Sequence, residues 1–82
     1  MYVVAALATA VLAEVDGHAA ESARRLGAVD GWLHKAGVIL DPDDAEEREA
    51  LRDRLVGQLG ADAFAVAGNA GAELDLPELL SN

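Results

Sequence analysis

The sequence contains no cysteine among its 82 residues. It therefore has no disulfide framework, no thiolate metal ligand and no cysteine nucleophile, and a reducing cytoplasm is the location we expect. Aromatic residues are also scarce, being limited to Tyr2, Trp32 and Phe64. Alanine, leucine and valine supply most of the 52% hydrophobic content, which favours closely packed helices over a β-sheet.

Basic residues are few, with six Lys and Arg against 15 Asp and Glu, so the formal net charge is −9. Such a surface repels a phosphate backbone. The basic residues are split between two predicted helices, and no basic stripe with interleaved aromatics occurs. We predict no direct binding to nucleic acid.

A long hydrophobic run is missing as well. The first fifteen residues are nearly all apolar, but a membrane span needs about 20 apolar residues, and Glu14 and Asp16 end the run early. A secretory signal requires basic residues before its apolar stretch, and none are present here. We predict neither membrane insertion nor export.

Motifs for catalysis or metal binding are not found. His18 and His34 are the only histidines, and along one helix they would be about 24 Å apart, too far to share a metal ion. The acidic run 41–49 lacks the spaced oxygens and central glycine of a calcium loop. No phosphate-binding glycine loop occurs, and neither Ser22 nor Ser81 has a neighbouring base. We predict no enzyme, no cofactor and no metal site.

What the sequence does contain is helical periodicity. The stretch 18–36, bounded by Gly17 and Gly37, predicts an amphipathic helix that other helices must cover. Its interior glycines, Gly27 and Gly31, each cost roughly 1 kcal/mol relative to alanine, so they indicate close approach of another helix. We expect that neighbour to be a first helix over 2–15, forming an antiparallel αα-hairpin over 1–37.

The first helix is apolar around its whole circumference, so we expect one of its faces to lack cover within this chain. Preceding helices of a longer protein, or a second copy in a homodimer, would cover it. Met1 lies inside the helical pattern without an N-cap, which suggests the edge of a longer protein; a natural domain starting in its first helix is the alternative. The residues predicted for this contact surface are Val4, Leu7, Val11 and Val15.

Asp41, Pro42 and two further aspartates predict the start of a third helix, with Asp41 as its side-chain cap and Gly60 as its end. A fourth helix follows from Ala61 to Asn69 or Ala72. Asp75 and Glu78 resemble a capping box for a short last helix over 76–80. The fold class is thus a single all-α domain over 1–82, with residues 41–82 forming its C-terminal helices. Its predicted core anchors are Leu26, Trp32, Leu33, Leu51, Leu55 and Phe64.

A resemblance to a known protein family rests on three segments: ARRLGAVDGWLHKAG at 23–37, DPDDAEEREALRDRLVGQLGADAFAVA at 41–67 and GAELDLPELL at 71–80. Their order is similar to the C-terminal end of the tetratricopeptide-like (TPR-like) region in large LuxR-type, ATP-dependent transcriptional regulators of bacteria. That resemblance implies a helical hairpin, an acidic-capped helix and a Leu-Gly-x-x-x-Phe joint, here Leu59, Gly60 and Phe64. Family members often carry an aromatic residue where Gly68 stands, which implies a shorter or looser fourth helix.

Nothing in the matching segment is catalytic in that family, whose ATP- and DNA-binding domains lie elsewhere. The resemblance therefore implies a TPR-like module of a transcriptional regulator that binds other proteins or self-associates. An alternative from the residues themselves is a small helical protein that binds an apolar ligand between its helices, with Trp32 and Phe64 lining the cavity.

Overall fold

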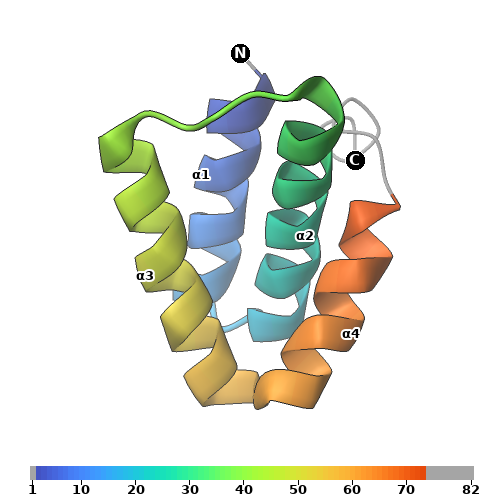
Figure 1. The fold of residues 1–82 in the computed structure, drawn as a ribbon. Helices are drawn as coiled ribbons and strands as arrows, with labels where there is room; N and C mark the ends of the chain where they lie inside the picture. Colours follow the sequence, from blue (N-terminus) through green and yellow to red (C-terminus); the bar gives the residue numbers. More distant parts are fainter. Residues whose placement is uncertain (1, 74–82) are drawn as a thin grey trace.

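The structure is a computed structural model that describes residues 2–73. It contains four helices: α1 (Tyr2–Val15), α2 (Ala19–Ala36), α3 (Pro42–Leu59) and α4 (Ala61–Ala72). Consecutive helices are antiparallel (Figure 1). The predicted all-α class is confirmed, and α4 reaches the later of its two predicted ends. The predicted helix over 76–80 and its cap, Asp75, lie outside the described residues.

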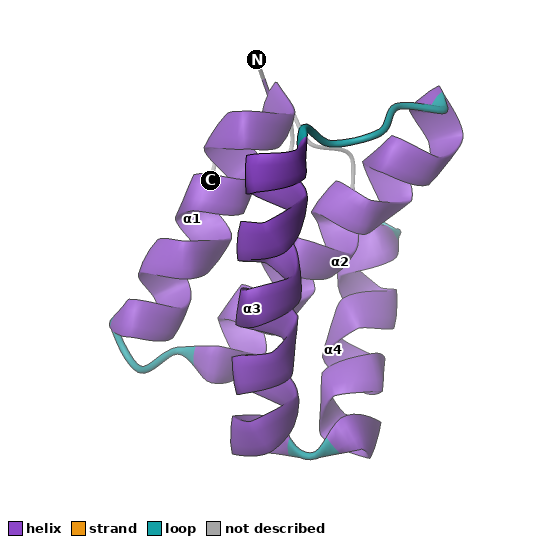
Figure 2. Ribbon diagram, turned by 60° about the vertical axis from the view of Figure 1, so that its left-hand side comes forward, coloured by secondary structure: helices purple, strands orange, loops and turns teal. Residues whose placement is uncertain are grey.

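Glycines separate the helices, and short loops join them (Figure 2). Gly37 has a φ of 66°, a left-handed conformation that glycine adopts at little cost, and the Val38 amide donates to the Leu33 carbonyl at 3.1 Å. Gly60 has a φ of 86° and separates α3 from α4. These local conformations explain why the helix boundaries could be read from the sequence.

The start of α3 differs from the prediction in one detail. Pro42 lies in the first turn as expected, but the Asp41 side chain makes no capping hydrogen bond. Instead, the Asp41 backbone carbonyl accepts a hydrogen bond from the Ala45 amide at 2.8 Å. The start of α3 therefore rests on Pro42 and on the carboxylates of Asp43 and Asp44 near the positive helix end.

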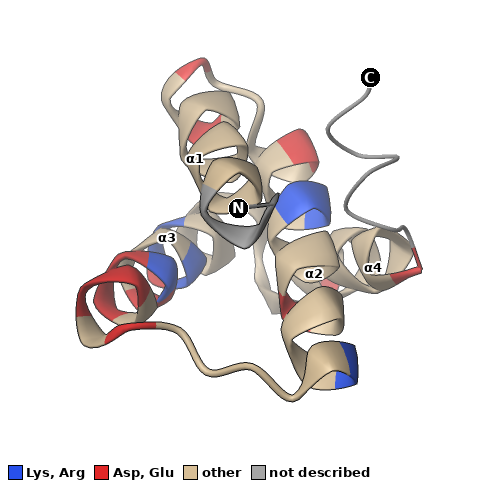
Figure 3. Cartoon of the chain, turned by 90° about the horizontal axis from the view of Figure 1, so that it is seen from above, with Lys and Arg blue, Asp and Glu red and all other residues tan. Residues whose placement is uncertain are grey.

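Helix α2 is the centre of the bundle. It contacts all three other described helices, whereas α1 and α4 lie on different sides of it without contacting each other (Figure 3). Of the predicted core anchors, Leu26, Leu51 and Leu55 are fully buried. The others are half-buried and pack against the core: Trp32, Leu33 and Phe64.

The contact between α1 and α2 is made largely by alanine. Ala6, Ala10 and Ala13 of α1 are buried, and their small side chains allow α2 to lie close. Ser22 of α2 is also fully buried, and its hydroxyl donates to the Ala10 backbone carbonyl at 2.6 Å. The buried hydroxyl is thereby satisfied, and it ties α2 to the middle of α1.

Glycines bring α2 and α4 into backbone contact. A Cβ atom added at Gly27 would lie 2.0 Å from the Gly68 carbonyl oxygen, and one added at Gly71 would lie 1.7 Å from the Arg24 carbonyl oxygen. The close approach expected at Gly27 and Gly31 therefore exists. The prediction from the sequence that α1 is the partner is wrong, because the neighbouring helix is α4. The reason is that alanine, not glycine, already provides the clearance needed for α1.

Replacing Gly27 by alanine should destabilise the fold by about 3 kcal/mol, because the new methyl group forces the α2 and α4 backbones apart. Gly57 of α3 is a matched control, since a Cβ there meets nothing within 4 Å. Gly57→Ala should stabilise the fold by up to about 1 kcal/mol through helix propensity. Urea unfolding followed by circular dichroism measures both; equal effects would contradict the backbone contact.

Candidate functional site

One face of α1 is uncovered and apolar. Its residues recur every three or four positions, and we call them the outer face of α1: Ala5, Ala8, Leu12 and Val15. All four are exposed, Leu12 by 61% and Val15 by 71%. Exposed leucine or valine alone is ordinary on a protein surface, but two of them one turn apart, on a helix face without a charged residue, form a candidate contact surface.

This face differs from the surface predicted from the sequence. Leu7 is only 2% exposed and belongs to the core, and Val11 is half-buried against that core. Val15 is exposed as predicted, while the side chain of Val4 lies outside the described residues. The predicted residues recur every three or four positions, but Leu7, Val11 and Val15 of this set lie along the boundary between the core and the exposed side of the helix.

Sequence reasoning missed Ala5, Ala8 and Leu12. A signal for them existed in the spacing of alanine: Ala6, Ala10 and Ala13 recur at four and three residues. Small residues with that spacing let two helices approach closely, so they are suited to an inner face. Placing them inward turns Leu12 outward.

The outer face of α1 also differs from the rest of the chain in its charge. Helix α1 has no charged residue before Glu14, and the Glu14 side chain is only 14% exposed. Its carboxylate accepts hydrogen bonds from Arg54 at 3.3 Å and from Gln58 at 2.8 Å, both on α3. Asp and Glu residues gather instead on α3 (Figure 3). The outer face of α1 is therefore the uncharged side of an acidic chain.

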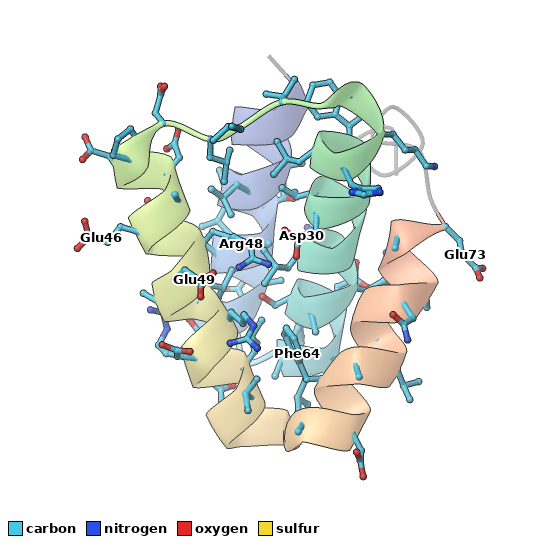
Figure 4. All side chains as sticks on the ribbon, in the orientation of Figure 1. Asp30, Glu46, Arg48, Glu49, Phe64 and Glu73 are labelled. Carbon is cyan, nitrogen blue, oxygen red and sulfur yellow. The ribbon has the colours of Figure 1, made fainter. Side chains whose placement is uncertain are left out.

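A second ion pair fixes α3 against α2. Arg48 donates from Nε to Oδ1 of Asp30 at 2.9 Å and from Nη2 to Oδ2 at 2.6 Å, and it also pairs with Glu49 (Figure 4). The hydrogen bonds to Asp30 raise the pKa of Arg48 above its ordinary value. This bidentate geometry is the strongest kind of arginine–carboxylate hydrogen bonding. It positions α3, and through Glu14 α3 in turn holds α1.

A shallow groove of about 340 Å³ runs between α2 and α4. Phe64 extends from α4 toward α2 at this groove (Figure 4). Trp32, the other aromatic residue predicted to line a cavity, does not line it and packs against Ala6, Ala28 and Val29 instead. The complete lining is Leu26, Gly27, Asp30, Gly31, His34, Phe64, Gly68, Asn69 and Ala72.

Other exposed large apolar side chains are dispersed. Val38 and Ile39 lie in the connection between α2 and α3, and Val66 is the only one on α4 in the described range. Among the described helices, α1 alone presents two such side chains on one face. The outer face of α1 is therefore the strongest candidate for a contact surface.

The described part of the chain holds no group of three His, Asp or Glu side chains arranged for a metal ion. Between residues 2 and 73, no helix combines the length and apolarity needed to cross a bilayer. Comparison of the sequence and the structure with known protein families, curated proteins and solved structures finds no match.

Glu21 joins two arginines of α2, one of which also contacts α1. Its carboxylate binds Arg24 at 2.8 and 2.6 Å and Arg25 at 2.7 Å, and Arg25 also donates to the Thr9 carbonyl of α1 at 3.4 Å. Hydrogen bonding from Arg24, assisted by Arg25, lowers the pKa of Glu21 from 4.5 to about 2. Between these two pH values the unfolded chain binds more protons at this residue than the folded chain does.

The contribution of Glu21 to stability should therefore be complete above pH 4.5 and be lost as the pH falls toward 2. We expect the difference in unfolding free energy between the wild type and Glu21→Gln to shrink over this range. Glu46→Gln is the control, because Glu46 extends away from the bundle (Figure 4). Denaturant unfolding at a series of pH values measures the difference, and a constant difference for Glu21→Gln would contradict the pKa shift.

Proposed function

We propose that this chain is a non-enzymatic protein-contact module that docks another helical surface on the outer face of α1. The observation that carries this proposal is the exposed apolar stripe that includes Leu12 and Val15, on a helix with no charged residue before Glu14. The bundle holds α1 by its inner face through Ser22 and at its C-terminal end through Glu14. The outer face is thus presented on a fixed support.

The helical-repeat resemblance supports the same proposal. In TPR-like arrays each hairpin leaves an apolar face that the neighbouring hairpin covers. Helices α1 and α2 form such an antiparallel pair, and the uncovered face belongs to the first helix of the pair. A role as the contact module of a cytoplasmic transcriptional regulator follows from this resemblance as part of the proposal.

Purified chain in solution offers one helical partner, namely another copy. We expect it to self-associate and expect Leu12→Glu with Val15→Glu to return it to monomer, because two buried carboxylates would then be desolvated at the contact. One helix face is smaller than a standard interface of about 800 Å² per partner, so micromolar or weaker association is expected. Sedimentation velocity over a concentration series measures it.

Val66→Glu is the matched control, because Val66 is as exposed as Val15 but lies on α4. It should leave association unchanged, and all of these exposed substitutions should alter stability by no more than about 0.5 kcal/mol. The proposal fails if the wild type stays monomeric at high concentration, or if the α1 and α4 variants behave alike.

A second candidate function is binding of an apolar ligand in the groove between α2 and α4. Its volume of about 340 Å³ falls at the lower end of small-molecule sites, and Leu26 and Phe64 supply apolar walls. Asp30 is the one acidic residue in the lining and no Lys or Arg lines it, so a neutral ring compound suits the groove better than a fatty acid.

Gly68→Leu tests this second candidate, because Gly68 lines the groove and a Cβ there meets nothing within 4 Å. The added side chain should fill the groove without separating the helices. If the groove binds ring compounds, adding naphthalene methanol should shift the amide resonances of Gly31 and Ala72 in the wild type but not in Gly68→Leu. Absence of shifts in the wild type would rule the ligand function out.

A further inference from the structure

Resting on the proposed function, we infer that the partner on the outer face of α1 is a second copy of this chain, bound antiparallel about a two-fold axis. In this arrangement Ala5 lies against Val15 of the partner subunit, and Ala8 lies against Leu12 of the partner subunit. The result is a closed dimer and not an open stack of helical hairpins.

The order of side-chain sizes along α1 favours this pairing. Along the described side chains of α1, the outer face has two small residues first, Ala5 and Ala8, and then two large ones, Leu12 and Val15. An antiparallel pair places small against large at every level, so the two helices keep an even separation. A parallel pair would place alanine on alanine at one end and leucine on leucine at the other, and it would leave a gap beside the alanines.

Charge favours the same contact. Each copy carries a net charge of −9, so two copies repel each other unless they meet away from their acidic residues. The outer face of α1 is uncharged, and the nearby carboxylate of Glu14 is already bound by Arg54 and Gln58. The acidic helix α3 packs on the inner side of α1 and stays outside the interface.

The helix ends also distinguish the two orientations. Asp16 is exposed directly after α1, and the first turn of α1 contains no acidic residue. In the antiparallel dimer Asp16 lies beside residues 2–5 of the partner's α1, which include no acidic residue. In a parallel dimer the two Asp16 carboxylates would face each other and repel.

Cysteine cross-linking tests the orientation cleanly, because the wild-type chain contains no cysteine. Ala5→Cys and Val15→Cys are prepared separately, one of them isotope-labelled, then mixed and oxidised mildly. Both positions are exposed, so both variants should fold. We expect rapid formation of the mixed disulfide between the labelled and unlabelled chains, at least tenfold faster than either variant alone.

The reason is distance along the helix axis. Ten residues separate positions 5 and 15, which is about 15 Å in an α-helix, so two copies of position 5 are too far apart for a disulfide in the antiparallel dimer. Val66→Cys mixed with Val15→Cys reports head-to-tail stacking of α1 on α4. Adding Leu12→Glu to each pair should abolish the mixed product if it comes from the proposed interface.

The outcomes separate the two proposals. Fast cross-linking of Ala5→Cys alone means a parallel dimer, and fast cross-linking of Val15→Cys with Val66→Cys means an open stack. Either result overturns the antiparallel dimer. So does a mixed disulfide between Ala5→Cys and Val15→Cys that forms no faster than the disulfides of the single variants. The contact function survives these results if Leu12→Glu with Val15→Glu still abolishes association, and it fails if the wild type stays monomeric or if the α1 and α4 variants behave alike.

Discussion

The backbone contact between α2 and α4 is the constraint on which the arrangement of this small bundle depends. Gly27 of α2 and Gly71 of α4 leave no room for a Cβ, so the two helices lie closer than side chains would permit. Alanine performs the same role between α1 and α2. Helix α2 is thereby buried by neighbours on three sides, although the chain has only three aromatic residues with which to fill a core.

The use of small residues for close packing has a consequence for α1. Its inner face is made mainly of Ala6, Ala10 and Ala13, so two of its larger apolar side chains, Leu12 and Val15, are not needed for close packing. Leu7 and Val11 do pack with the buried leucines of α2 and α3. Leu12 and Val15 are exposed on a helix whose opposite face packs against the bundle. The exposure of that face follows from how the core is packed.

Polar interactions set the positions of the helices more than they fill the core. The Asp30–Arg48 pair joins α2 to α3, and Glu14 joins α1 to α3 through Arg54. These pairs use carboxylates that would otherwise add to the repulsion within an acidic chain. Helix α3 carries six of the 15 acidic residues, whereas α1 carries only Glu14, whose carboxylate is bound by α3.

The sequence by itself determined the helical class and the places where the helices begin and end, because Gly37, Pro42 and Gly60 act through local backbone conformation. It also showed that α2 needed a close neighbour and that α1 carried more apolar surface than the chain could cover. Only the tertiary structure decided which neighbour and which face. An interior glycine shows that another backbone comes close but does not show which one. A helix that is apolar on nearly every side has no polar face from which its orientation can be read.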